Sequence, residues 1–183
     1  MRKQLKHMDR AVRRFTRMLP VLALAAAACG DPYGPQPWNP LPQSVTVFSA
    51  SRAEYVGLVS AIDLVNEPVR AISIEAPGAT GNWDFVLMDG PNNTLQLVPA
   101  AAFEGITSRA RIAVIENRDF LDIREAPRDT ALYTAAPVTL RTGVVYVVRS
   151  RRGVCGFTTG VRYAKMQPVE IDPARGVFRA AIV

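Results

Sequence analysis

Histidine is almost absent from this sequence, since the only one, His7, lies within the first ten residues. The rest of the chain therefore cannot build a Ser-His-Asp triad, a cysteine activated by histidine, or a zinc, copper or haem site with a histidine ligand. Lysine is also scarce, and Lys165 is the only one after residue 28. The lack of histidine excludes the histidine-dependent hydrolase and metalloenzyme sites, and we expect neither a cofactor nor a metal.

The chain also has no apolar run long enough to cross a membrane as a helix. Its longest uncharged apolar segment at the N-terminus, residues 18–28, would span about 16 Å as a helix, roughly half of a hydrocarbon core of about 30 Å. Seven basic residues and one acidic residue precede it. A basic region, a short apolar region and small residues at its end form a secretory signal peptide, which we expect at residues 1–28.

A cysteine follows the small residues at the end of that segment. The junction "AAACG" at residues 26–30 resembles the lipobox of bacterial lipoproteins. The resemblance covers residues 1–30 only, and it implies that Cys29 is diacylated and becomes the N-terminus of the exported protein. Because Gly30 rather than aspartate follows the cysteine, the resemblance favours the outer membrane over the inner membrane. Cleavage by ordinary signal peptidase within the alanine run is the alternative.

Residues 29–43 are rich in proline and glycine. A segment with this composition forms neither a helix nor a central strand. We expect it to be an extended tether between the lipid anchor and a folded domain. The domain itself is predicted to occupy residues 44–183, and because Val183 still lies in a predicted strand, the sequence is expected to be a fragment.

The surplus of basic residues lies in the predicted signal peptide. The whole chain carries 22 basic and 16 acidic residues, but seven basic residues and one acidic residue precede Cys29, which leaves 15 of each. A chain with balanced charge has no electrostatic preference for a polyanion, so we expect no nucleic-acid partner. The expected partners are the membrane, through the lipid anchor, and an envelope protein or glycan.

The second cysteine, Cys155, has no partner if Cys29 is acylated. Three interpretations remain open: a small buried residue, a disulfide with Cys29 in a protein without the lipid, or a partner beyond Val183. A catalytic thiol is the least expected, because no histidine is present to activate it.

Apolar residues alternate with polar ones over most of residues 44–183, which is typical of β-strands. Residues 83–99 and 168–183 each predict a hairpin with a proline- or glycine-containing turn. Residues 143–150 are apolar on both faces, which indicates a strand covered on both sides. About ten short strands predict an all-β fold, an antiparallel β-sandwich that is immunoglobulin-like in the loose sense, with a barrel as the alternative.

Residues 52–65 do not follow this pattern clearly. Ser51 and Glu54 have the spacing of a helix capping box, and the apolar residues that follow have a helical spacing. Gly57 and the β-branched residues oppose a helix. We therefore predict either a short helix or an extended edge segment.

Four acidic residues recur every three positions in the most polar stretch of the chain: Glu116, Asp119, Asp122 and Glu125. Such a cluster could be a calcium loop, or a carboxylate pair that performs acid–base chemistry on a sugar. Three arginines alternate with the acids, and calcium loops avoid interleaved cations. We therefore favour mutual ion pairs on a solvated loop and a protein that is not an enzyme, with a carboxylate-dependent glycan hydrolase as the alternative.

A second group of oxygen-bearing residues contains Asp84, Asp89, Asn92 and Asn93. Aspartate and asparagine are also the residues that a tight turn requires, so the turn explains them without a bound ion. Trp83 alternates with core positions, and we expect it in the core.

The last candidate site is basic and contains Arg149, Arg151 and Arg152. These residues are predicted to lie at the tip of a hairpin, where they could bind phosphate, lipid headgroups or an acidic glycan. The structural interpretation, which we favour, is a polar turn that discourages the pairing of sheet edges.

Overall fold

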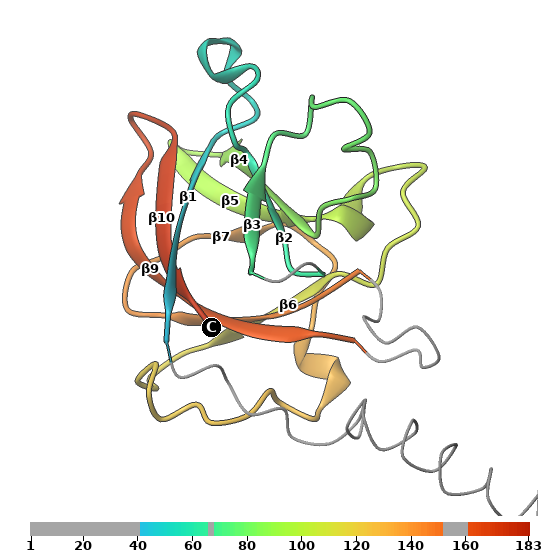
Figure 1. Ribbon diagram of the computed structural model, residues 1–183. Coiled ribbons are helices and arrows are strands. Elements are labelled where there is room, and N and C mark those ends of the chain that lie inside the picture. The colour runs from blue at the N-terminus through green and yellow to red at the C-terminus, as the bar shows by residue number, and fades with distance from the viewer. Residues whose placement is uncertain (1–40, 66–67, 152–160) are drawn as a thin grey trace, which may run out of the picture. The chain divides into compact units, whose positions relative to one another are not determined.

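The computed structural model describes residues 41–65, 68–151 and 161–183, which belong to one compact unit (Figure 1). The predictions for the signal peptide, Cys29, Cys155 and Arg152 lie outside these residues. The described residues form two five-stranded antiparallel sheets. This is the predicted β-sandwich rather than the alternative barrel.

The first sheet has the strand order β1-β10-β9-β8-β6. Its strands are β1 (Gln43–Phe48), β6 (Arg111–Ile115), β8 (Val145–Arg149), β9 (Tyr163–Asp172) and β10 (Val177–Ile182). The second sheet has the order β3-β2-β4-β5-β7. Its strands are β2 (Ala61–Asp63), β3 (Arg70–Ile72), β4 (Phe85–Gly90), β5 (Thr94–Pro99) and β7 (Val138–Thr139). Three short 3-10 helices lie in the connections: η1 (Ala53–Tyr55), η2 (Ala100–Ala102) and η3 (Thr130–Leu132).

The main hydrophobic core contains side chains from both sheets. Alternate residues of β1 and β8 belong to it, Val45 and Val47 on the first strand and Tyr146 and Val148 on the second. This follows from the strand period of two residues, which puts alternate side chains on the same face. A large apolar side chain that becomes fully buried contributes about 1.5–3 kcal/mol, so this core is the main source of stability. Trp83 also lies here, as predicted, and packs edge-on against Phe103.

A second, smaller cluster covers the other face of the first sheet. Two other residues of β8, Val145 and Val147, pack there against Phe120 and Ile123. These two belong to residues 116–137, which we call the cover segment and which follow β6 (Figure 1). β8 is therefore buried on both faces, as its sequence predicts.

Both predicted hairpins are present. β4 pairs with β5, and the turn between them places Asn92 and Asn93 in the left-handed region with φ of 55° and 54°. β9 pairs with β10, and Gly176 has a φ of 64° in that turn. Asparagine and glycine are the residues that adopt this conformation at least cost, which explains why they mark these turns.

Residues 52–65 contain a short helix, although it is only a single 3-10 turn, and the prediction of an extended edge segment is wrong. One 3-10 turn, η1, is followed by β2, which lies between β3 and β4 within the second sheet. Gly57 has a φ of 85°, which interrupts a helix at that point. The Ser51 hydroxyl accepts a hydrogen bond from the backbone N–H of Asp89 at 3.2 Å rather than capping a helix.

Candidate functional site

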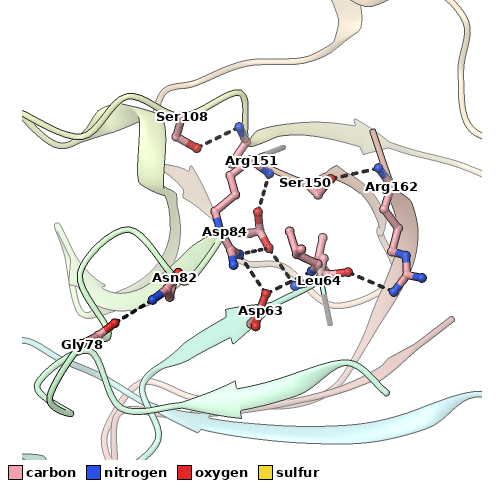
Figure 2. Close-up of polar contacts among 11 residues, drawn as sticks. Asp63, Leu64, Gly78, Asn82, Asp84, Ser108, Ser150, Arg151 and Arg162 are labelled. Atoms are coloured by element: carbon pink, nitrogen blue, oxygen red, sulfur yellow. Dashed lines mark hydrogen bonds and ion pairs between the residues drawn. The ribbon is translucent and has the colours of Figure 1, made fainter. Parts of the chain in front are cut away.

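Three charged side chains lie together in the interior, and they come from both sheets (Figure 2). Asp63 is the last residue of β2, Asp84 directly precedes β4, and Arg151 follows β8 by two residues. Their exposed fractions are only 3%, 0% and 7%. Arg151 Nη1 donates to Oδ1 of Asp63 at 2.8 Å and to Oδ2 of Asp84 at 2.9 Å.

The backbone completes the environment of both carboxylates. Asp84 accepts hydrogen bonds from the N–H of Leu64 at 2.7 Å and from the N–H of Arg151. Asp63 accepts one from the N–H of Val65 at 3.0 Å. Burial raises the pKa of Asp84 above its ordinary value, and the charge of Arg151 opposes that effect. Since the carboxylates belong to one sheet and the guanidinium to the other, this cluster joins the two sheets.

Arg162 lies beside this cluster and makes a second connection. Its backbone N–H donates to the Ser150 hydroxyl at 2.9 Å, and its Nη1 donates to the carbonyl of Leu64 at 3.2 Å (Figure 2). Burial lowers the pKa of the Arg162 guanidinium, while Asp63 raises it.

The arginines predicted at an exposed tip have different environments. Arg151 is buried and paired, so its guanidinium does not lie on a tip that could meet a ligand. Arg149 is half-buried in β8, and its Nε is buried without a hydrogen-bond partner among the described residues. Arg152 lies outside the described residues. Sequence reasoning did not identify Asp63 as a partner, although an aspartate between Ile62 and Leu64 is a signal of buried charge.

Part of the acidic cluster lines a pocket in the cover segment. The pocket has a volume of about 390 Å³, and its charged lining residues are Arg118, Asp122, Arg124, Glu125 and Arg128. Two of the four predicted carboxylates therefore line one pocket. The other two, on residues 116 and 119, do not line it.

Mutual pairing of these acids and arginines is only partly present. Glu125 lies 3.7 Å from Arg128 in an exposed pair. Glu116 binds Arg141, which lies outside the polar stretch. Within the part of the chain that the structure describes, the remaining members of the cluster form no ion pair: Arg118, Asp119, Asp122 and Arg124.

A buried lysine fixes the turn beneath the pocket. Lys165 lies in β9 and is 5% exposed. Its Nζ donates to the carbonyl of Phe120 at 2.6 Å and to that of Ile123 at 2.9 Å, and it lies 4.3 Å from the centre of the Phe120 ring. Burial lowers the pKa of the Lys165 amine. Because Ile123 lines the pocket, this contact holds one of its walls against the sheet.

The turn explains only two members of the second oxygen cluster, and arginines engage the two aspartates. Asp84 belongs to the buried cluster, whereas Asp89 pairs with Arg52 at 2.9 Å. Asn92 and Asn93 occupy the left-handed positions of the β4–β5 turn. The four residues thus have separate structural roles.

Among the described residues, no three histidine, cysteine, aspartate or glutamate side chains come together as a potential metal site. None of the helices in that part of the chain has the length and apolar character needed to span a membrane. Comparisons of the chain with protein-family models, with curated proteins and with solved structures find no match. Function is therefore inferred from the residues of this chain.

Proposed function

We propose that this protein is a lipid-anchored protein of the bacterial cell envelope whose β-sandwich is a non-enzymatic binding or structural module. The observation that carries the proposal is the junction at residues 26–30. There Cys29 follows small residues at the end of an apolar segment, which itself follows seven basic residues. The resemblance to a lipobox implies diacylation of Cys29, and it favours the outer membrane.

The segment after Cys29 supports this proposal. Residues 29–43 contain five prolines among fifteen residues. An extended chain of this length spans roughly 45 Å at about 3.1 Å per residue. The first strand begins at Gln43, so such a tether would present the whole sandwich at a distance from the bilayer surface.

The ion pairs of four acidic side chains support a role for these four that is not catalytic. A glycosidase needs two carboxyl groups that face each other across the scissile bond. Glu116 is engaged by Arg141 and Glu125 by Arg128. The buried carboxylates of Asp63 and Asp84 are both bound to Arg151. These pairings suit structural roles for the carboxylates.

The anchor is tested by labelling cells that produce the protein with a radioactive fatty acid. We expect label in the wild-type protein and none in Cys29→Ser. A Cys155→Ser variant is the matched control, and it should be labelled like wild type. Equal labelling of wild type and Cys29→Ser would reject the anchor, as would a wild-type protein without label. Separation of inner and outer membranes then tests the preference for the outer membrane.

The second candidate function is a carboxylate-dependent glycan hydrolase, and one observation favours it. Asp122 and Glu125 line the same pocket. This candidate predicts release of reducing sugar ends from envelope glycan, abolished in Asp122→Asn and Glu125→Gln. Our proposal predicts no release by wild type.

A further inference from the structure

We propose that the pocket of the cover segment binds a small molecule that carries one oxyanion group, a carboxylate or a phosphate, beside hydroxyl groups. The inference deepens the binding function proposed above, because it assigns that function a site and a class of ligand. Arg118 and Arg124 would hold the oxyanion, and Asp122 would accept hydrogen bonds from the hydroxyl groups.

The two arginines are the residues that would bind the oxyanion. Arg118 and Arg124 line one pocket and form no ion pair or hydrogen bond among the described residues. A guanidinium offers five N–H donors in a planar fork that matches the geometry of carboxylate and phosphate oxygens. Two such cations at one pocket repel each other, and an anion bound between them removes that repulsion. The neighbouring cation, Arg128, is already engaged by Glu125 at 3.7 Å.

The size of the pocket and the carboxylate of Asp122 indicate what else the ligand contains. A volume of about 390 Å³ exceeds what a single inorganic ion fills, and it falls within the range of small-molecule sites, which starts at about 300 Å³. Asp122 also lines the pocket without an ion-pair partner. A carboxylate accepts hydrogen bonds but donates none, so it repels a second anion and favours hydroxyl donors. An acidic sugar satisfies both the arginines and Asp122.

The buried lysine, Lys165, fixes the turn between the two arginines. Lys165 binds the carbonyls of Phe120 and Ile123, which lie between Arg118 and Arg124 in the sequence. Phe120 and Ile123 also pack their side chains on the outer face of the first sheet. The turn that separates the two arginines is therefore held in place before a ligand arrives, which lowers the entropy cost of binding.

The test is a titration of the full-length protein in detergent, followed by calorimetry, with three probes: glucuronate, glucose 1-phosphate and glucose. We expect saturable binding of at least one charged probe and none of glucose. Binding of glucuronate alone identifies a carboxylate ligand, and binding of glucose 1-phosphate alone identifies a phosphate ligand. Affinity should fall as sodium chloride rises from about 20 mM to about 500 mM, because salt screens exposed charges.

Variants assign the binding to the pocket. We expect Arg118→Gln and Arg124→Gln each to weaken binding by about tenfold or more, since each removes charged hydrogen bonds. Asp122→Asn should weaken it less, because the amide oxygen still accepts. The matched control is Arg70→Gln, an exposed arginine on β3 that lies in the other sheet. All four variants should unfold at the wild-type temperature.

Three results would overturn the inference: no saturable binding of either charged probe, equal binding of glucose, or an unchanged affinity in Arg118→Gln/Arg124→Gln. None of these measurements depends on the lipid. If the protein binds glucuronate but takes up no fatty acid, the proposed anchor is rejected and the proposed site is supported. If the protein takes up the fatty acid but binds no probe, the proposed anchor is supported and the proposed site is rejected.

Discussion

Arg151 Nη1 donates to Asp84 Oδ2 at 2.9 Å, across 67 positions of sequence, and this contact links the connection after β8 to the start of β4 in the other sheet. The same nitrogen reaches Asp63 at 2.8 Å. All three side chains are buried, so this guanidinium contacts two carboxylates away from water.

Arg151→Met should lower the free energy of unfolding by about 3–5 kcal/mol, because it removes the cation that contacts both buried carboxylates, Asp63 and Asp84. Urea unfolding followed by tryptophan fluorescence measures the loss. The triple variant Asp63→Asn/Asp84→Asn/Arg151→Met removes all three charges and should recover part of the stability. Arg179→Met, which breaks an exposed pair with Glu170, is the control and should change the midpoint far less. A loss below about 1 kcal/mol in Arg151→Met would contradict the role of this cluster.

Lys165→Met should loosen the turn beneath the pocket. The methionine retains much of the side-chain volume but donates to neither the Phe120 nor the Ile123 carbonyl. We expect faster hydrogen exchange at the backbone amide of Asp122, which is bonded to the Asp119 carbonyl at 3.1 Å. The β9–β10 amides serve as the internal reference and should be unchanged. Unchanged exchange at Asp122 would show that Lys165 does not hold the turn.

The same lysine predicts a dependence of stability on alkaline pH. Burial lowers the pKa of Lys165 in the folded state below its ordinary value of 10.5, so the unfolded chain binds more protons between those two values. The stability contributed by this group is present above pH 10.5 and is lost as pH falls through the lowered pKa. The difference in unfolding free energy, wild type minus Lys165→Met, should therefore rise with pH over this window. A difference that stays constant or falls would contradict the lowered pKa.

Gly143 and Gly176 both have a left-handed backbone conformation, but only Gly176 has a side chain close to it. Substituting each one by alanine therefore distinguishes the cost of backbone strain from the cost of crowding. Gly143 has a φ of 72° with nothing within 4 Å of an added Cβ, whereas a Cβ on Gly176 would lie 2.6 Å from Arg52 Nε. Gly143→Ala should cost about 1–2 kcal/mol from backbone strain alone. Gly176→Ala should cost more, because Arg52 would have to leave Asp89 and the carbonyls of Pro173 and Ala174. Thermal unfolding of both variants measures the difference, and equal losses would show that Arg52 moves at no cost.

Much of the fold is predictable from the sequence because its signals are local. Strand alternation depends on neighbouring residues, and it predicts the sandwich and the two faces of β8. Turn chemistry is local as well, and residues such as Asn92 and Asn93 mark the hairpins correctly. The two alternatives at residues 52–65 have a local cause too, since the capping-box spacing favours a helix and Gly57, which has a left-handed conformation, opposes one.

The polar contacts were harder to predict because they join distant parts of the chain. Arg151 and Asp63 are 88 positions apart, and Lys165 is 45 positions from Phe120. No spacing rule relates residues so far apart, and only the packing of the sheets brings them together. For the same reason, the arginine that pairs with Glu116 is Arg141 and not one of its neighbours in the polar stretch.

The measurement that decides most about this protein is the mass of its N-terminal peptide, after purification from bacterial membranes and proteolysis. We predict a peptide that begins at Cys29 and carries diacylglycerol on its sulfur. A peptide that begins at another residue, or an unmodified Cys29, would contradict the membrane anchor and with it the proposed place of this protein in the cell envelope.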